Sequence, residues 1–383
     1  MASVRTHPRL PPGAREQAAT RLVFFITGLG YAAWAPLVPF AKARAGVGEG
    51  GLGLLLLSLG AGSIVAMPLA GALAARLGCR IVIIGSALLF CLALPVLASA
   101  ASLPLLVAAL LAFGAGVGAI DVTMNIQAII VERAGLRPMM SGFHGLFSLG
   151  GIAGAGGMAA LLAAGASPLV ATLVITACVL VALAMAAPHL LTYGSRREGP
   201  SFAWPHGIVL FLGILCFIAF MAESAVLDWS AVFLVSARGM AASYAGLGYT
   251  VFALTMTLGR LTGDRIVRLV GGRNVILFGG LCAAAGFALS TMFGSWEVTL
   301  LGYALVGVGS ANIVPVLFTA VGRQRVMAEH VAVPAITTLG YAGILVGPAG
   351  IGFVAHTTSL STAFLILALL LLGVAASGRM LRL

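Results

Sequence analysis

The sequence predicts an all-α integral membrane protein in which twelve transmembrane helices form two pseudo-symmetric six-helix bundles. Composition is the first reason, because 61% of the 383 residues are hydrophobic and only 8% are charged. Soluble domains contain about 25% charged residues. The other two reasons are a series of twelve apolar segments and a repeat that relates the first six segments to the last six.

Each of the twelve segments is long enough to cross about 30 Å of hydrocarbon. They cover residues 21–41, 52–75, 80–99, 103–131, 139–163, 168–190, 206–235, 241–263, 274–293, 297–320, 331–354 and 359–378. The turns are short, so consecutive helices are expected to be antiparallel neighbours. Four parts follow: a cytoplasmic amino-terminal tail (1–20), a first bundle (21–190), a cytoplasmic linker (191–205) and a second bundle (206–383).

The basic residues predict the orientation, since loops rich in Lys and Arg stay in the cytoplasm. Of the 21 basic residues, 18 fall on the side of the amino terminus, and only Lys42, Arg44 and Arg238 fall on the other side. Both termini are therefore expected in the cytoplasm, and the chain is expected as a multi-pass protein of a bacterial inner membrane.

The two halves repeat at an offset of 193 residues. At this offset Phe24 meets Phe217 and Arg80 meets Arg273, and glycines also coincide in several helices. Two halves with the same orientation form a parallel repeat, and solute sites in such folds lie near the midplane between the halves.

Several function classes are excluded. The basic residues are scattered singly and form no nucleic-acid-binding patch. There is no phosphate-binding loop, and Lys42 is the only lysine, which argues against ATP as the driving force. The five cysteines show no metal-ligand or disulfide spacing. We therefore expect no cofactor and no metal, and a membrane-embedded enzyme is disfavoured because the acidic and His residues lack nucleophile–base spacing.

The main candidate residue is Asp121, in the middle of the apolar run 103–131. Helical spacing places Gly114, Gly118, Asn125 and Asp121 close to one stripe, where the glycines allow a neighbouring helix to approach. Intramembrane acids are costly and are functional by default. A buried titratable site beside a solute cavity is the favoured interpretation, and a structural partner for a neighbouring helix is the alternative.

The sequence resembles the major facilitator superfamily over essentially its whole length. The loop from Gly71 to Arg80 resembles the family's Gly-x-x-x-Asp-Arg-x-Gly-Arg-Arg motif, with departures at Ala75 and Cys79. A second copy runs from Gly259 to Arg273 and keeps an acid. In the family these loops brace the inner gate. The resemblance thus implies gating roles for residues of both copies, namely Arg76, Arg80, Arg260, Asp264 and Arg265.

Two further patterns place the chain within the family. The sequence Gly343-Ile-Leu-Val-Gly347-Pro348-Ala-Gly350 resembles the glycine–proline pattern that drug antiporters carry on helix 5, but helix 5 here has no proline. The run 121–125 together with 141–151 is similar to an uncharacterised bacterial inner-membrane branch near the fucose-permease-like transporters. In that branch an acid on helix 4 serves proton coupling, which implies this role for Asp121.

Other candidates each have two interpretations. Glu223 is expected in the outer half of the cavity as a second titratable site, whereas Asp228 is expected to be hydrated or capping. His144, in a stripe with Ser148, is either a neutral His with one partner or a proton-handling group. Arg260 and Asp264, at positions i and i+4, are expected to form an ion pair at the inner gate.

Asn312 precedes Pro315 and is expected to bind solute or a carbonyl that the proline leaves free. Tyr31 and Trp34 lie one turn apart, where they either stack on solute or anchor the helix at the interface. Together with Asn125 and Ser148, these residues complete the expected solute site.

The expected function is secondary active transport of a small polar organic solute, such as a sugar or sugar derivative, by alternating access and with proton coupling. The chain is expected to act as a monomer in the lipid bilayer, with the solute and protons as its partners. An efflux antiporter for amphiphilic compounds is the rival within this class. A non-transporting membrane sensor is the rival outside it.

Overall fold

The computed structural model describes residues 12–46, 49–195, 203–240 and 247–379, and these contain helices but no strands. Most of the predicted tail, the centre of the predicted linker and the start of the predicted segment 241–263 lie outside the described residues. The all-α prediction is confirmed for the part that is described.

Nine helical elements form the first half. They are α1 (Ala14–Ala32), η1 (Ala35–Leu37), α2 (Val38–Ala45), α3 (Glu49–Leu77), α4 (Cys79–Ser99), α5 (Leu103–Gly135), α6 (Met140–Ala163), α7 (Pro168–Ala186) and η2 (Ala187–His189). The second half consists of α8 (Gly207–Arg238), α9 (Leu247–Val270), α10 (Gly272–Met292), α11 (Trp296–Ser310), α12 (Ile313–Arg323), α13 (Glu329–Thr357) and α14 (Leu360–Ser377).

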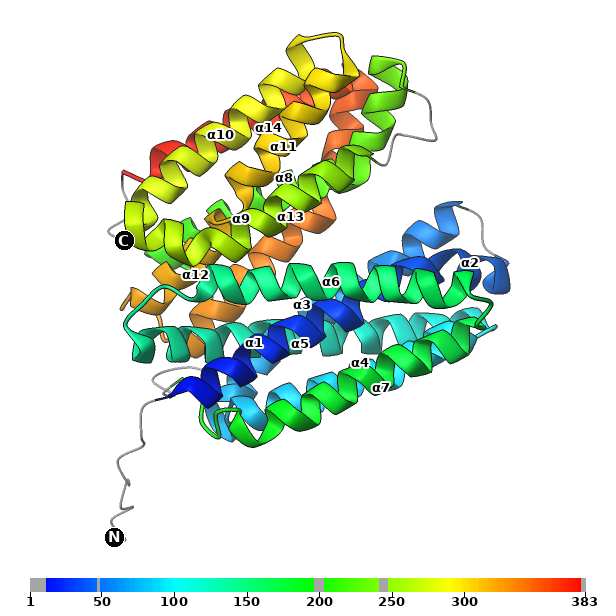
Figure 1. The fold of residues 1–383 in the computed structure, drawn as a ribbon, viewed down its shortest axis with the longest axis vertical. Helices are drawn as coiled ribbons and strands as arrows, with labels where there is room; N and C mark the ends of the chain where they lie inside the picture. The colour runs from blue at the N-terminus through cyan, green and yellow to red at the C-terminus, as the bar shows by residue number, and fades with distance from the viewer. Residues whose placement is uncertain (1–11, 47–48, 196–202, 241–246, 380–383) are drawn as a thin grey trace, which may run out of the picture.

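The two halves are separate bundles that pack at an angle to each other (Figure 1). They meet at the end of the molecule where both termini lie, and they diverge toward α2. We call the first of these ends the basic end, because its helix termini and turns carry Arg76, Arg80, Arg133, Arg137, Arg265, Arg268, Arg273, Arg323 and Arg325. The bundles touch mainly through α3 with α13 and α6 with α9.

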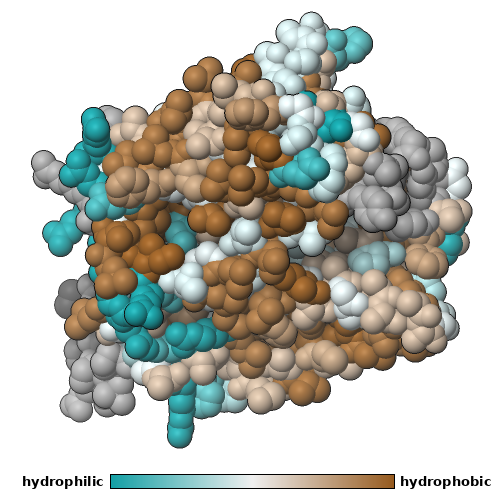
Figure 2. All heavy atoms as spheres, turned by 45° about the horizontal axis from the view of Figure 1, so that its top comes forward, coloured by the Kyte–Doolittle hydropathy of each residue, from teal (hydrophilic) through white to brown (hydrophobic). Residues whose placement is uncertain are grey.

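The outer surface is suited to lipid. Figure 2 shows hydrophobic residues across the middle of one face, with hydrophilic residues at its left edge and also at the upper right. Eleven spans among the described residues are long and apolar enough to cross a membrane. The one predicted segment without such a span in the described ranges corresponds to α9. This helix is less apolar because it carries four charged residues, Arg260, Asp264, Arg265 and Arg268.

Glycines on α5 allow this helix to pack closely on α3, as the sequence predicted. A Cβ atom on Gly114 would overlap the carbonyl oxygen of Leu59, and one on Gly118 would lie 2.7 Å from the Cα of Ser63. The hydroxyl of Ser63 also donates a hydrogen bond of 2.8 Å to the carbonyl of Gly114. This close contact fixes the part of α5 that precedes Asp121.

Several boundaries differ from the prediction; α9, for example, ends at Val270, seven residues after the predicted end at 263. Helix α1 begins at Ala14, seven residues before the predicted start at 21, so part of the predicted tail is helical. The predicted segment 297–320 is interrupted between α11 and α12, at Ala311 and Asn312. Pro315 explains this interruption, because its nitrogen has no hydrogen to donate to the carbonyl four residues earlier, which belongs to Ala311.

Candidate functional site

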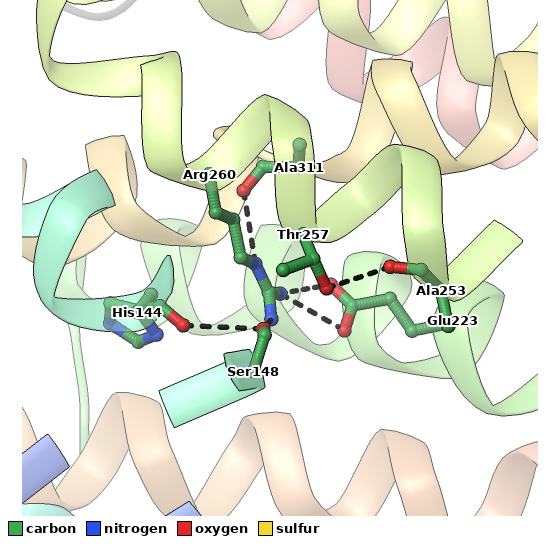
Figure 3. A network of polar contacts seen from close by, with 7 residues as sticks. All are labelled: His144, Ser148, Glu223, Ala253, Thr257, Arg260 and Ala311. Atoms are coloured by element: carbon green, nitrogen blue, oxygen red, sulfur yellow. Dashed lines mark hydrogen bonds and ion pairs between the residues drawn. The ribbon is translucent and has the colours of Figure 1, made fainter. Parts of the chain in front are cut away.

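Arg260 on α9 lies at the centre of a polar network between the bundles (Figure 3). The side chain is buried, and its Nη2 donates to both carboxylate oxygens of Glu223 on α8, at 3.2 Å each. Nη1 donates to the hydroxyl of Ser148 on α6 at 3.0 Å, and Nε donates to the carbonyl of Ala311 at 3.2 Å. One guanidinium therefore joins three helices of the second half to the first half.

The interruption between α11 and α12 supplies one of these acceptors. The carbonyl of Ala311 lacks its usual helical partner because Pro315 cannot donate a hydrogen bond. Arg260 donates a hydrogen bond to this carbonyl in place of the missing backbone donor. Asn312, which was expected to bind a freed carbonyl or solute, instead donates to the carbonyl of Gly259 at 3.0 Å, and its own side-chain oxygen has no partner among the described residues.

The expected ion pair between Arg260 and Asp264 is wrong, because Arg260 pairs with Glu223. Asp264 points instead at the start of α6, where its Oδ1 accepts a hydrogen bond of 3.0 Å from the backbone N–H of Gly142. The i and i+4 spacing did place the two residues near one face of α9. The spacing could not show that Arg260 pairs with a residue of α8 and Asp264 with the start of α6.

Asp121 on α5 makes a contact that crosses between the bundles. The hydroxyl of Tyr341 on α13 faces its carboxylate, within electrostatic range. Asn125 lies one turn further along α5, and its side-chain amide donates to Oδ1 of Asp121 at 3.3 Å and to the backbone carbonyl of Asp121 at 2.9 Å. Asp121 is half-buried and has no cationic partner among the described residues.

Tyr341 was not among the predicted residues. The repeat could have identified it, because Tyr341 occupies the position of Ser148 at the offset of 193 residues. Both residues contact the facing bundle, Ser148 through Arg260 and Tyr341 through Asp121. Ser148 and Tyr341 therefore occupy equivalent positions in the two halves, although their partners on α9 and α5 do not correspond at this offset.

His144 on α6 is buried between aromatic rings from both bundles. Its ring centroid lies 5.3 Å from that of Phe24 on α1 and 5.7 Å from that of Phe318 on α12. Its Nε2 has no hydrogen-bond partner among the described residues. The backbone carbonyl of His144 accepts a hydrogen bond from Ser148, which links it to the Arg260 network.

The remaining predicted solute residues differ in exposure. Tyr31 is 38% exposed and lies within electrostatic range of Asp121 and Asp228. Trp34 is packed in the hydrophobic core of the first half, and its indole nitrogen has no partner among the described residues. Asp228 is exposed, consistent with the expectation of a hydrated acid.

At the basic end, polar contacts join the two bundles. Arg133 of α5 forms an ion pair of 2.7 Å with Glu329 of α13 and also donates to the carbonyl of Gly322. Glu132 accepts a hydrogen bond of 2.7 Å from the hydroxyl of Thr319 on α12. The basic end is therefore closed by contacts that the sequence did not predict.

The start of α6 is held by acids from both bundles. Glu132 accepts hydrogen bonds from the backbone N–H groups of Met139 and Met140, at 2.7 and 2.8 Å. Asp264 accepts from the N–H of Gly142. These donors have no partner within the helix, and the helix dipole favours negative charge at this position. A residue of the second half thus caps a helix of the first.

The other predicted gating residues make fewer contacts. Arg76, Arg80 and Arg265 form no side-chain hydrogen bond or ion pair with another residue that the structure describes. Ala75 stands where the first copy of the motif would carry an acid, so the capping interaction of Asp264 has no counterpart from that copy. No group of three or more metal-ligating side chains occurs within the described ranges.

The apolar helices and the two angled bundles define a polytopic membrane protein over the described residues. Residues 22–324 match the family model of the Major Facilitator Superfamily. The chain belongs to this superfamily.

Similar proteins support this assignment. The chain is 54% identical to an uncharacterized transporter of the same type from Yersinia pestis, over 98% of this chain and 99% of the relative. It is 33% identical to membrane protein MosC of Rhizobium meliloti, over 91% and 85% of the two chains. Among solved structures, FucP in the outward conformation has a TM-score of 0.78 at 17% identity, with 96% of this chain and 98% of FucP covered.

Proposed function

We propose that the chain is a secondary active transporter that moves a small polar organic solute, such as a sugar derivative, by alternating access and with proton coupling. The observation that carries the proposal is the half-buried carboxylate of Asp121 on α5, which bonds to Asn125, faces Tyr341 of the opposite bundle and has no cationic partner among the described residues. Structurally similar proteins include a fucose:proton symporter and a proton:xylose symporter, which supports this choice of solute and ion.

Alternating access requires the contacts at one end to break while those at the other end form. In this structure the bundles are joined at the basic end and diverge at the opposite end. Opening the basic end would separate Arg133 from Glu329 and Asp264 from the start of α6. These residues are the proposed gate, with Arg76, Arg80 and Arg265 as further members from the motif loops.

Asp121 is the proposed proton-coupling residue, and Glu223 and His144 are the second candidates. The charge of Glu223 is already balanced by Arg260 at 3.2 Å, whereas Asp121 is held only by neutral donors. Burial disfavours a charge that has no partner. A change of protonation at Asp121 therefore perturbs the contact between bundles more directly than one at Glu223.

The proposed solute site lies between Asp121 and the Arg260 network. Asn125, Ser148 and Asn312 offer polar groups there, and Tyr31 offers an exposed aromatic ring. Trp34, by contrast, would contact solute only if the packing of the first half changed. An opening of the Arg260–Ser148 contact would release two donors that a hydroxyl-bearing solute can use.

We further propose that the basic end faces the cytoplasm of a bacterial cell and that the chain works as a monomer in the inner membrane. The number of arginines at that end supports the orientation. The related proteins from Yersinia pestis and Rhizobium meliloti support a bacterial setting.

The test is a two-stage experiment. Purified protein is first screened by thermal unfolding against sugars, organic acids and amphiphilic drugs, because a bound ligand raises the unfolding midpoint. Uptake of the best ligand is then measured in proteoliposomes with an imposed pH gradient. Accumulation of a polar solute along the proton gradient supports the proposal. Stabilisation by amphiphilic drugs alone would instead support an efflux antiporter.

A further inference from the structure

A cavity of about 550 Å³ opens at the basic end, between the two bundles. Its walls come from α5 and α6 in the first half and from α9 and α12 in the second. We propose that this cavity binds the headgroup and the adjoining acyl chain of an anionic phospholipid. The site is separate from the network around Arg260 and Asp121, and none of those residues lines it.

The rim of the cavity is positively charged. Arg133, Arg137, Arg268 and Arg323 line it, and all four are exposed. Arg133 forms an ion pair with Glu329, and Arg137 donates a hydrogen bond of 3.1 Å to Gln17. Arg268 and Arg323 form no hydrogen bond or ion pair with any other residue in the described ranges. Two guanidinium groups thus remain available, and guanidinium matches phosphate oxygens with paired hydrogen bonds.

The acids in the cavity do not neutralise these two arginines. Glu132 accepts hydrogen bonds from the start of α6 and from Thr319, so both of its oxygens are occupied. Asp264 is directed at the N–H of Gly142, at the start of α6. Because Arg133 is paired with Glu329, three arginines face two acids that are held by helix donors, and the cavity keeps a positive potential that attracts an anion.

The deeper wall of the cavity is apolar, with Ile129, Val267 and Val316 among its residues. Leu136, which also lines the cavity, is 94% exposed. A small inorganic anion would use only the arginine rim. A phospholipid would use both parts, with its phosphate at the rim and its chain along the apolar residues, as in basic pockets between membrane helices.

Because the walls belong to both bundles, a bound lipid would contact both halves while the basic end is closed. Opening of this end would pull Arg268 and Arg323 of the second half away from Arg137 of the first. The lipid would therefore favour the arrangement seen here. An anionic lipid would then act on the transporter as a ligand and not only as solvent.

The experiment measures binding to purified, delipidated full-length protein through the midpoint of thermal unfolding. The probes are a short-chain phosphatidylglycerol, phosphatidylcholine with the same chains, glycerol phosphate and inorganic phosphate. The test variant is Arg268→Gln/Arg323→Gln. The matched control is Arg273→Gln/Arg325→Gln, which removes the same charge at the same end but outside the cavity.

Phosphatidylglycerol should stabilise the wild type and the control at lower concentration than phosphatidylcholine does. In the test variant its affinity should fall about thirtyfold, since each arginine near a phosphate contributes about 1 kcal/mol. The single variants, Arg268→Gln and Arg323→Gln, should each weaken binding about fivefold, and they serve if the double variant does not fold.

Three results would overturn the proposal. Equal stabilisation by the two lipids would show that the headgroup charge is not recognised. Equal weakening in the test and control variants would show a general charge effect of this end. Stabilisation by inorganic phosphate or glycerol phosphate that matches phosphatidylglycerol would show a soluble anion site in place of a lipid site.

Discussion

Asp264 offers a sharp test of how the basic end is kept closed, because it caps a helix of the opposite bundle. Replacement by Ala removes the hydrogen bond to Gly142, 3.0 Å long, and the negative charge at the start of α6. Loss of a helix cap costs about 0.5–2 kcal/mol. Asp264→Ala should therefore raise the ratio of molecules with an open basic end to those with a closed one by about 2- to 30-fold.

The assay is a distance measurement between spin labels on a cysteine-free background. Labels at Leu77 on α3 and Leu269 on α9 lie on exposed positions of opposite bundles at this end. Asp264→Ala should add a population at longer distance. The matched control is Asp228→Ala, which removes an exposed acid that caps no helix. If the distance distribution of Asp264→Ala equals that of the wild type and of the control, the cap does not contribute to closure.

Three further predictions follow from the packing and the charges. Glu223→Gln leaves buried Arg260 without its counter-ion and should lower the free energy of unfolding by about 3 kcal/mol, whereas Glu297→Gln at the exposed start of α11 should have little effect. Gly114→Ala should destabilise the protein by about 1–3 kcal/mol, because α3 must move away, and Gly85→Ala, which has open space, is its control. Leu136→Cys should resist a membrane-impermeant thiol reagent in intact cells while Ser295→Cys reacts, and the reverse pattern would contradict the orientation.

Most of the fold could be predicted because hydropathy and length determine which segments cross a bilayer. Helix boundaries were less certain, and α1 began earlier than its apolar run because the polar residues after Ala14 still favour a helix. The break before Pro315 lay inside a continuous apolar run. Hydropathy alone does not detect such a break, although the proline indicated where one carbonyl would be free.

The site was predicted less completely, because its contacts join helices that are distant in sequence. Asp121, Asn125, Ser148 and Glu223 were found as polar residues in apolar helices. Their partners depend on how the bundles pack, so local spacing favoured the wrong acid for Arg260. The repeat could have predicted that Tyr341 faces the opposite bundle, because it is equivalent to Ser148. That inference requires knowing first that Ser148 lies at the interface between the bundles.

The proposed proton coupling is tested most directly by pH-driven uptake into proteoliposomes that contain Asp121→Asn. The solute is the polar compound that gives the largest shift in the thermal screen, and Asp228→Asn is the matched control. Asp121→Asn should fold, bind the solute and exchange it across the membrane, because Asn has nearly the same shape and its side-chain oxygen can still accept the hydrogen bond from Asn125. It should lose accumulation driven by the pH gradient, which the control keeps. Accumulation by a well-folded Asp121→Asn protein at the wild-type level would contradict proton coupling at Asp121.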